Sequence, residues 1–437
     1  MHLFRTLILL IACNALPVRA EAAAPLNVVT IVADDVGWGD MGFHGSKIRT
    51  PSLDRLAAEG VRLDRFYVNP ICSLTRAALM TGQFTRRTGV NNRSGLPLDY
   101  RTLPQDFHEA GWQTWMCGKW HLGGTSDNDF AGREYHPDKR GFDHFYGLLG
   151  GAVDYYEHIN HQTGELDWWR DGTPAKDDGY STDLLADEAI KRLRGRDQAK
   201  PFLLHLAFNA AHGPLNLPPG KSASRGAATY AAVVESMDAA IGRVMTALAE
   251  EKLVESTVVL FFCDNGAQEG RGGSNAPLRG AKGGAYEGGV RSAAVVRGPG
   301  LKAGTVSQQW MFAGDVWPTL AAAAGVTPKP AKPFDGVNVW AALTKSEVMT
   351  RPGMEVGARE LAWLSVPWKL VQQADGSREL YDLTKDPSEA KNLAAEKQDI
   401  IAKLAADWEK TMAGVKPRGG PGRPGPGVKG RRPKGTP

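Results

Sequence analysis

Cysteine is scarce in this sequence, with only four in 437 residues. One of them, Cys13, falls in the apolar N-terminal segment, so Cys72, Cys117 and Cys263 remain beyond it. An odd number of cysteines in so long a chain does not indicate a disulfide framework. No pair of cysteines or histidines has the spacing of a zinc site. Cys117 and Cys263 lie in apolar runs, where we expect them to pack in the core. Cys72 is the cysteine left for chemistry.

Long apolar runs are missing as well, except at the N-terminus. There Arg5 precedes an apolar run over residues 7–12, and small residues follow at Val18 and Ala20. This pattern predicts a secretory signal peptide over residues 1–22. The residues up to Cys13 also fit a lipoprotein box, so a lipid anchor at Cys13 stays open. No other run is long enough to span a bilayer. We therefore expect an exported protein, periplasmic or secreted, that is not integral to a membrane.

An excess of charge of one sign is confined to the C-terminal tail. The net charge is only +4, and residues 415–437 carry lysine and arginine but no acid. A tail so rich in glycine and proline cannot pack, and we expect it to be disordered. It has no aromatic residues between its cations, which argues against nucleic-acid binding. It could hold the protein to an anionic polysaccharide or only keep it soluble.

Apolar runs and helical segments alternate along the first three quarters of the chain. Strands buried in a parallel sheet are predicted at residues 27–33, 112–119, 201–208 and 256–263. Helices are predicted at 51–60, with Ser52 as the N-terminal cap, and at 102–110, 182–194 and 230–251. This alternation predicts an α/β fold with a mainly parallel sheet and helices on both faces. Residues 123–176 have no sustained period and predict a long excursion over a site.

The pattern changes beyond residue 335. Two short alternating runs, 368–373 and 378–383, flank the turn Asp375-Gly376 and predict a β-hairpin. A helix is predicted to follow from about residue 400 to 413. We therefore predict a catalytic domain over 25–335 and a small C-terminal subdomain with an antiparallel sheet over 336–414.

Polar side chains follow directly after the predicted strands. The carboxyl ends of parallel strands meet at one edge of an open sheet, so these side chains can lie close together. Taken alone, a pair of acids usually marks a turn or a helix cap, and a single histidine usually has a hydrogen-bond partner and no role in a site. The residues that follow the strands are Asp34, Asp35, Lys119, His121, His212, Asp264 and Asn265. The carboxylate and amide oxygens among them form a set of hard donors, which suits Ca²⁺ or, less well, Mg²⁺.

The stretch from Asn69 to Gly82, NPICSLTRAALMTG, predicts a helix that begins at Cys72. Arg76 lies four residues on and therefore on the same face. Free N–H groups at a helix start, together with a guanidinium, suit a tetrahedral oxyanion. The alternative is that Cys72 is a packed small hydrophobe and Arg76 a surface cation.

This stretch resembles the signature of the type I sulfatases, Cys-x-Pro-x-Arg. The likeness runs in the family's order from about residue 27 to 393, although position 74 is leucine where the family has proline or alanine. It includes DDVGWGD at 34–40, GFHGSKIRTPSLDRLAAEG at 42–60, GKWHLGG at 118–124, HGPL at 212–215, FFCDNG at 261–266 and GGAYEGGVR at 283–291. With DYYEH at 154–158 and WWRDG at 168–172, the chain is most similar to the arylsulfatase B (N-acetylgalactosamine 4-sulfatase) branch.

The resemblance implies an alkaline-phosphatase-like fold and a cysteine, Cys72, that a formylglycine-generating maturation enzyme converts to Cα-formylglycine. Calcium would be held by residue 72 together with Asp34, Asp35, Asp264 and Asn265. Arg76 would stabilise the hydrated aldehyde, and Lys119 and Lys282 would hold sulfate oxygens. His121 would act as the base in sulfate elimination, and His212 would assist the leaving oxygen.

The implied activity is that of a sulfuric ester hydrolase acting on a sulfated carbohydrate or an aryl sulfate. Two alternatives stay open: a phosphate or phosphonate monoester hydrolase of the same fold, and a non-catalytic binder of sulfated glycans if Leu74 prevents maturation. Aromatic residues of the excursion could stack on sugar rings or pack locally: Tyr155, Tyr156, His158, Trp168 and Trp169.

Overall fold

A computed structural model describes residues 25–415, apart from 92–93, 124, 127–128, 131 and 223–225. The predicted signal peptide over 1–22, with Cys13, lies outside the described residues, as does the predicted tail beyond its first residue, Val415. Within the described residues, no helix is both long enough and apolar enough to cross a membrane.

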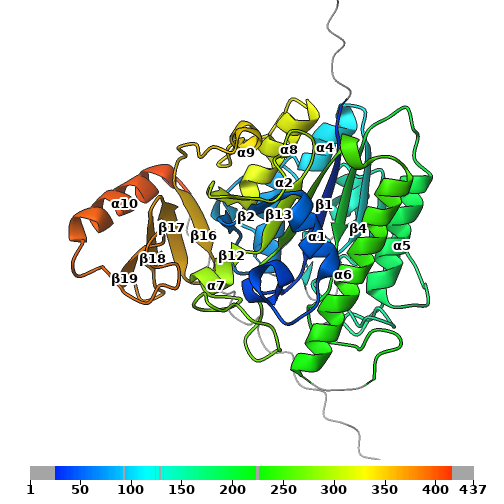
Figure 1. The fold of residues 1–437 in the computed structure, drawn as a ribbon, viewed down its shortest axis with the longest axis horizontal. Helices are drawn as coiled ribbons and strands as arrows, with labels where there is room; N and C mark the ends of the chain where they lie inside the picture. Colours follow the sequence, from blue (N-terminus) through cyan, green and yellow to red (C-terminus); the bar gives the residue numbers. More distant parts are fainter. Residues whose placement is uncertain are drawn as a thin grey trace, which may run out of the picture.

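The centre of the molecule is a parallel block within a ten-stranded sheet (Figure 1). Every residue of strand β1 (Asn27–Ala33) in this block is buried, as the continuous apolar sequence of the strand predicts. The block runs in the order β11 (Thr257–Cys263), β1 (Asn27–Ala33), β10 (Phe202–Ala207), β4 (Gln113–Gly118) and β7 (His144–Gly147). All neighbours in this block pair in parallel. The predicted mainly parallel sheet is therefore confirmed.

Shorter strands extend the sheet on both sides. Beyond β11 come β13 (Ala294–Arg297), β2 (Val61–Leu63) and β14 (Thr305–Ser307), and beyond β7 come β8 (Trp169–Arg170) and β9 (Thr173–Pro174). β13 pairs antiparallel with both of its neighbours, as does β8. The expectation of an irregular excursion over 123–176 was wrong in part, because this region supplies β7, β8 and β9. Their runs of two to four residues are too short to show a period.

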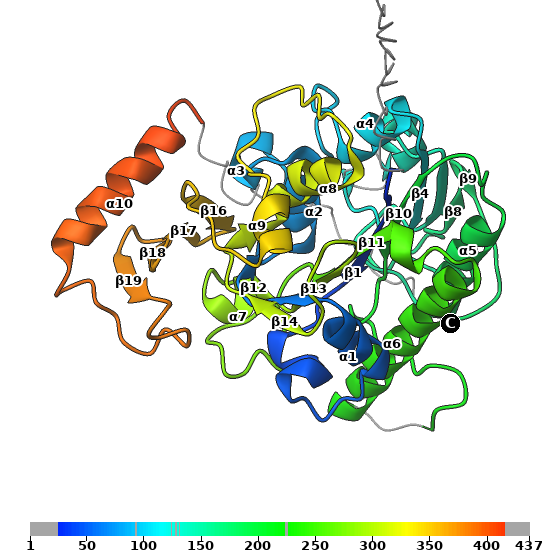
Figure 2. The ribbon, with the colours of Figure 1, turned by 45° about the horizontal axis from the view of Figure 1, so that its top comes forward.

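Helices cover both faces of the sheet, and alternate residues of β1 face the two resulting cores. Val29 and Ile31 pack on the side of α1 (Pro51–Glu59), α5 (Ser181–Arg194) and α6 (Ala227–Glu250). Val28 and Val32 pack on the side of α2 (Cys72–Thr81), α4 (Leu103–Glu109), α8 (Val316–Ala324) and α9 (Trp340–Lys345). Figure 2 shows the two groups of helices on opposite sides of the strands. The shorter helices are α3 (Thr85–Thr88) and α7 (Glu287–Val290).

Helix α1 begins differently from the prediction. Thr50, and not Ser52, occupies the N-cap position, and Pro51 takes the first helical position. Proline suits that position because a residue there needs no N–H group for the hydrogen bonds of the helix. The free N–H groups of Ser52 and Leu53 donate to the carboxylate of Asp238 on α6, at 3.0 and 2.8 Å. A side chain from another helix thus replaces the local cap.

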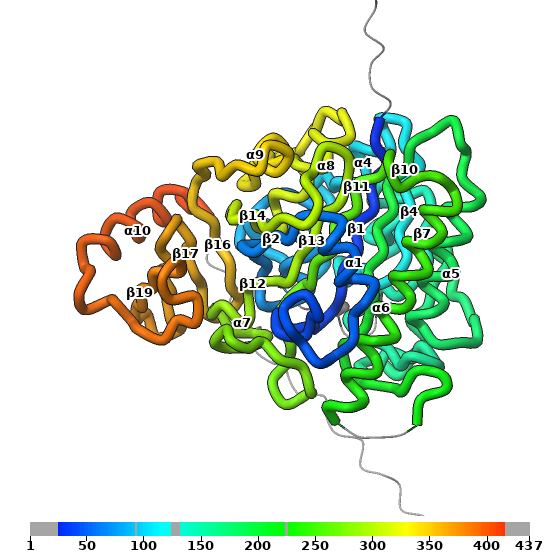
Figure 3. The backbone as a smooth tube through the Cα atoms, viewed as in Figure 1, coloured from blue at the N-terminus to red at the C-terminus, as the bar shows by residue number. Residues whose placement is uncertain are grey.

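The C-terminal part forms a separate antiparallel sheet with one helix beside the larger body (Figure 3). Its elements are β16 (Met354–Gly357), β17 (Leu361–Ser365), β18 (Trp368–Gln372), β19 (Arg378–Asp382) and α10 (Gln398–Thr411). The predicted hairpin is β18 and β19. Lys369 of β18 is fully buried and joins the two bodies, because its Nζ lies 2.9 Å from Glu287 and 2.8 Å from Glu389.

Two small sheets complete the described structure. One consists of β12 (Arg291–Ser292), β3 (Phe66–Tyr67) and β15 (Met311–Phe312), and the other of β5 (Thr125–Ser126) and β6 (Asp129–Phe130). The cysteines of the described chain, Cys72, Cys117 and Cys263, are free and buried. Core packing of Cys117 and Cys263 is confirmed.

Candidate active site

The register of the sheet brings three polar residues to the same edge. Ala33 pairs with Cys263, and Ala207 pairs with Gly118, so each strand ends at the same level. The next residues are Asp34, Asp264 and Lys119. Their backbone N–H groups continue the pairing to Ala210, Ala33 and Ala207 at 2.8 to 2.9 Å.

Gly118 makes this close approach possible. Its φ is +123°, and a Cβ at this position would lie 1.8 Å from the carbonyl oxygen of Ala207. Any side chain here would therefore push β4 away from β10 and displace Lys119.

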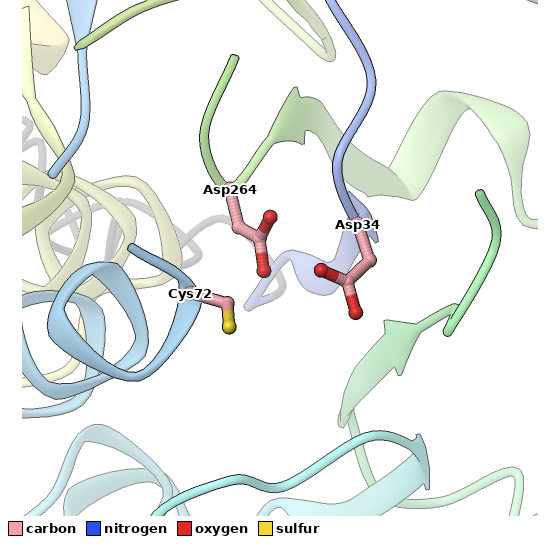
Figure 4. A group of neighbouring side chains, drawn as sticks. All are labelled: Asp34, Cys72 and Asp264. Carbon is pink, nitrogen blue, oxygen red and sulfur yellow. The ribbon is translucent and has the colours of Figure 1, made fainter. Parts of the chain in front are cut away.

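Cys72 is the first residue of α2 and faces the strand ends (Figure 4). Its Sγ and one carboxylate oxygen each from Asp34 and Asp264 lie within 4.8 Å of one another. The Nδ1 atom of His121 is 3.2 Å from the sulfur. Burial raises the pKa of the Cys72 thiol, so an unmodified side chain here is a poor nucleophile at neutral pH.

Arg76 and Lys119 are buried cations that bind the carboxylates of the strand ends. The Nη2 atom of Arg76 donates to Asp264 at 2.7 Å, and its Nη1 donates to the carbonyl oxygen of Lys119 at 2.6 Å. The Nζ atom of Lys119 lies 2.5 Å from Asp34 Oδ2. Burial alone would lower the pKa of Lys119, but the anionic groups around it, Asp34 foremost, together outweigh burial, raise the pKa and keep the lysine charged. The alternative of Arg76 as a surface cation is excluded, because its side chain is 2% exposed.

Asp35 is the second centre of the site. Its carboxylate accepts hydrogen bonds from Lys282 Nζ at 2.7 Å and from Asn265 Nδ2 at 2.8 Å, and His212 Nε2 lies 3.6 Å away. Burial would raise the pKa of Asp35, but His212, Lys282, the hydrogen bond from Asn265 and Lys119 together outweigh burial and lower the pKa. Asp35 and His121 both have positive φ, at 59° and 56°, a conformation that is uncommon for residues other than glycine.

Two oxygens of this cluster are suited to a cation. Asp34 Oδ1 and Asn265 Oδ1 are buried and have no hydrogen-bond partner in the described part of the chain. A buried oxygen without a donor is costly unless something else binds it. Burial and the nearby Asp34 raise the pKa of Asp264 to about 6, which shows how crowded the acids are. Oxygen donors of this kind fit a hard divalent cation, so the acidic groups form a possible metal site.

The charges of the site explain what a cation would change. The acids Asp34, Asp35 and Asp264 are balanced by the cations Arg76, Lys119 and Lys282. A divalent cation would leave the cluster with a net positive charge. Such a site would attract an anionic ester, which the acids alone would repel.

Two supporting residues were not predicted from the sequence. The hydroxyl of Tyr230 on α6 donates to Asp40 Oδ2 at 2.6 Å and lies 3.2 Å from the carbonyl oxygen of Asp35. Asp40 also accepts from the N–H groups of Gly37 and Ser274, both at 2.9 Å. This network fixes the loop after β1. The acid at the end of DDVGWGD was the available signal, whereas nothing local marks Tyr230.

The aromatic residues of the excursion pack inside the protein. Tyr155, His158 and Trp168 are at most 1% exposed, and the His158 and Trp168 rings stack with centroids 4.3 Å apart. Stacking of these three on a sugar ring is therefore excluded. Trp169 is half-buried, and Tyr156 is 40% exposed.

The fold and this cluster define an alkaline-phosphatase-like α/β protein with acids and cations gathered at the carboxyl edge of its sheet. A family model described as Sulfatase matches residues 26–326. The chain belongs to the sulfatase family, whose members are sulfuric ester hydrolases. The predicted resemblance to type I sulfatases is confirmed at this level.

Known relatives show how far the likeness extends. Arylsulfatase J of Mus musculus is 37% identical over 351 residues, which are 76% of this chain and 57% of that protein. N-acetylgalactosamine-6-sulfatase of Homo sapiens is 32% identical over 377 residues, 76% of this chain and 68% of that protein. The crystal structure of Ps i-CgsB in complex with k-i-k-neocarrahexaose has a TM-score of 0.82 at 29% identity and covers 90% of this chain and 94% of that chain. This chain spans little more than half the length of arylsulfatase J.

Proposed function

We propose that this protein removes sulfate from a sulfated carbohydrate or an aryl sulfate at the site around residue 72. The observation that supports this most strongly is the buried group in which the Cys72 sulfur meets Asp34 and Asp264 within 4.8 Å. Arg76, Lys119 and Lys282 provide buried or half-buried positive charge beside it. The complex of Ps i-CgsB with k-i-k-neocarrahexaose supports a carbohydrate as the leaving group.

Two groups would complete the site. Asp34, Asp35, Asp264 and Asn265 would hold Ca²⁺, or less well Mg²⁺, and the bound cation would polarise the ester oxygens. A maturation enzyme would convert Cys72 to Cα-formylglycine, and a hydroxyl of the hydrated aldehyde would supply an oxygen nucleophile in place of a thiol.

The remaining side chains bind the ester and move protons. Lys119 and Lys282 would contact sulfate oxygens, and Arg76, which donates to Asp264, would stabilise negative charge at residue 72. Burial and the nearby Lys119 lower the pKa of His121 well below its ordinary value, so the ring is neutral and can accept a proton. Its Nδ1 faces the side chain of residue 72 at 3.2 Å, as a base acting on that residue requires.

His212 would donate a proton to the leaving oxygen. Its Nδ1 lies 2.7 Å from the carbonyl oxygen of Gly213, to which it donates, so its Nε2 is the atom free for the ester. Burial and Lys119 lower the pKa of His212 to about 4. The negative charge of a bound ester would raise that pKa and favour the protonated ring.

Leu74 does not disturb this arrangement. It is a residue of α2, its side chain is buried in the core, and the helix begins at Cys72 without a proline at position 74. An effect of the unusual leucine would therefore fall on maturation and not on the geometry of the site. If maturation failed, the protein would keep a thiol in an intact anion site and act as a binder.

The activity is tested with 4-nitrophenyl sulfate and the matured full-length protein. Cys72→Ala and His212→Ala should each abolish turnover, while Cys117→Ala, a buried cysteine outside the site, should keep most of it. Wild-type rates in Cys72→Ala would contradict the proposal. Faster turnover of 4-nitrophenyl phosphate by the wild-type protein would favour a phosphate monoester hydrolase.

The setting of the enzyme is also part of the proposal. The predicted signal peptide and the sulfatase relatives support export to the periplasm or outside the cell, with a lipid anchor at Cys13 as the alternative. The maturation enzyme and the sulfated substrate are then its two partners.

A further inference from the structure

The loop that carries His212 is held by three tyrosine hydroxyls. It leaves β10 and runs from Asn209 to Leu217. Tyr155 donates to the carbonyl oxygen of His212 at 3.0 Å, Tyr180 to that of Asn216 at 3.1 Å, and Tyr156 to that of Leu217 at 2.8 Å. These contacts bring the three phenols to the protein backbone instead of to a ligand.

Tyr155 differs from the other two because it closes the turn that carries His212. Its hydroxyl also lies 3.2 Å from the carbonyl oxygen of Asn209, and the N–H of His212 donates to that same carbonyl at 2.8 Å. One phenol thus spans both ends of the turn from 209 to 212. Tyr155 is fully buried and stacks on Tyr180 with ring centroids 5.2 Å apart, so its hydroxyl cannot turn elsewhere.

The opposite side of the turn is bound to the strand end that carries the acids. The N–H of Ala211 donates to the carbonyl oxygen of Asp34 at 2.6 Å, and the N–H of Asp34 donates to that of Ala210 at 2.9 Å. The turn is therefore fixed between Asp34 and Tyr155. A shift of the turn would move His212 relative to the acids.

The His212 ring itself has few other supports. Among the described residues, its polar contacts are the carbonyl oxygen of Gly213 at 2.7 Å and the carboxylate of Asp35 at 3.6 Å. The first contact lies on its own loop and moves with it. The backbone position of residue 212 therefore decides where Nε2 points.

We infer that Tyr155 is a positioning residue for His212, which it holds in place to protonate the leaving oxygen. The inference rests on the proposed function, because it requires His212 to act on the leaving group. Burial raises the pKa of Tyr155 well above its ordinary value, so the hydroxyl stays a donor across the working pH range. Tyr155 then serves the chemistry through the backbone of the loop, and not through contact with a sugar.

This role has a signature that a purely structural role lacks. A proton donor matters most for a leaving group of low acidity and least for one that departs readily as an anion. Displacing a donor by a fraction of an ångström should therefore slow esters of weakly acidic alcohols and phenols selectively. General loss of folded enzyme would slow all esters equally.

The test compares Tyr155→Phe with Tyr180→Phe on 4-nitrophenyl sulfate and 4-methoxyphenyl sulfate. Tyr180 is a matched control, since it is also buried and loses a hydroxyl bonded to the same loop, four residues from His212. Tyr155→Phe should lower kcat on the methoxyphenyl ester by about tenfold or more and on the nitrophenyl ester only slightly. Tyr180→Phe should affect the two esters equally.

The outcomes separate this inference from the proposed function. Equal slowing of both esters by Tyr155→Phe, or no slowing at all, would overturn the positioning role. The same selective loss in Tyr180→Phe would also overturn it, because the effect would then belong to the loop in general. If the matured wild-type protein released sulfate neither from these esters nor from a sulfated oligosaccharide, the proposed function itself would fall, and the inference with it.

Discussion

Adding and removing a divalent cation should change the stability of the folded protein. Asp34 Oδ1 and Asn265 Oδ1 are buried without a partner among the described residues, and three carboxylates crowd the same edge of the sheet. A cation would bind these oxygens only in the folded state, because the unfolded chain does not bring them together. Such a ligand raises the free energy of unfolding in proportion to the logarithm of its concentration.

The expected size follows from the length of the chain. At a Ca²⁺ concentration about a hundredfold above Kd, the free energy of unfolding should rise by about 2.7 kcal/mol. A folded body of roughly 400 residues has an unfolding entropy on the order of 0.8 kcal/mol per kelvin. Ca²⁺ should therefore raise Tm by about 3 °C over the chelated protein, measured by scanning calorimetry.

The control separates the site from general effects of the salt. Asn265→Ala removes one oxygen donor and should lose most of the increase in Tm. Asn338→Ala removes an exposed side chain outside the site, whose Oδ1 accepts a hydrogen bond from the N–H of Trp340 at 2.9 Å. It should lower Tm slightly and keep the full Ca²⁺ effect. An unchanged Tm in the wild-type protein, or a full increase in Asn265→Ala, would refute the assigned cation site.

Three further substitutions test the structure around this site. Lys369→Met removes the buried cation that Glu287 and Glu389 share and should lower the free energy of unfolding by about 3–5 kcal/mol in urea titrations. Burial alone would raise the pKa of Glu188, but the hydrogen bonds and charges of His144 and Arg170 outweigh burial and lower the pKa to about 2. Its stabilisation is therefore present above about pH 4.5 and lost toward pH 2, so Glu188→Gln should cost about 3 kcal/mol at pH 7 and progressively less as the pH falls from 5 to 3. Arg76→Lys keeps the charge but loses the two-pronged hydrogen bonding, and should lower kcat/KM for 4-nitrophenyl sulfate by about tenfold or more. An unchanged free energy of unfolding in Lys369→Met or Glu188→Gln, or an unchanged kcat/KM in Arg76→Lys, would contradict the role given to that side chain.

Much of the site could be predicted because the strands that carry it have a strong local signal. The buried runs that became β1, β4, β10 and β11 are apolar and β-branched, and the ends of parallel strands must share one edge. Because Asp34 and Asp264 each directly follow such a strand, the sequence alone predicts that they lie near each other. The start of α2 at Cys72 likewise has a local cause in the loop before it.

Contacts between distant side chains could not be predicted in this way. The rings of Tyr155 and Trp168 suggested sugar stacking as readily as packing, because composition does not tell which side of a loop faces the core. The cap of α1 was misplaced because its partner, Asp238, lies on another helix. Tyr230 supports Asp40 across a similar gap in sequence. Each of these depends on tertiary packing, which overrides local preference.

The chemical state of residue 72, in protein purified from the organism that makes it, decides most directly whether this site is a sulfatase site. Trypsin should release the peptide from Phe66 to Arg76, and its mass distinguishes the two states. We expect a peptide in which one oxygen has replaced the sulfur and two hydrogens of Cys72. A peptide that retains the intact thiol, in a preparation that still hydrolyses 4-nitrophenyl sulfate, would contradict this expectation.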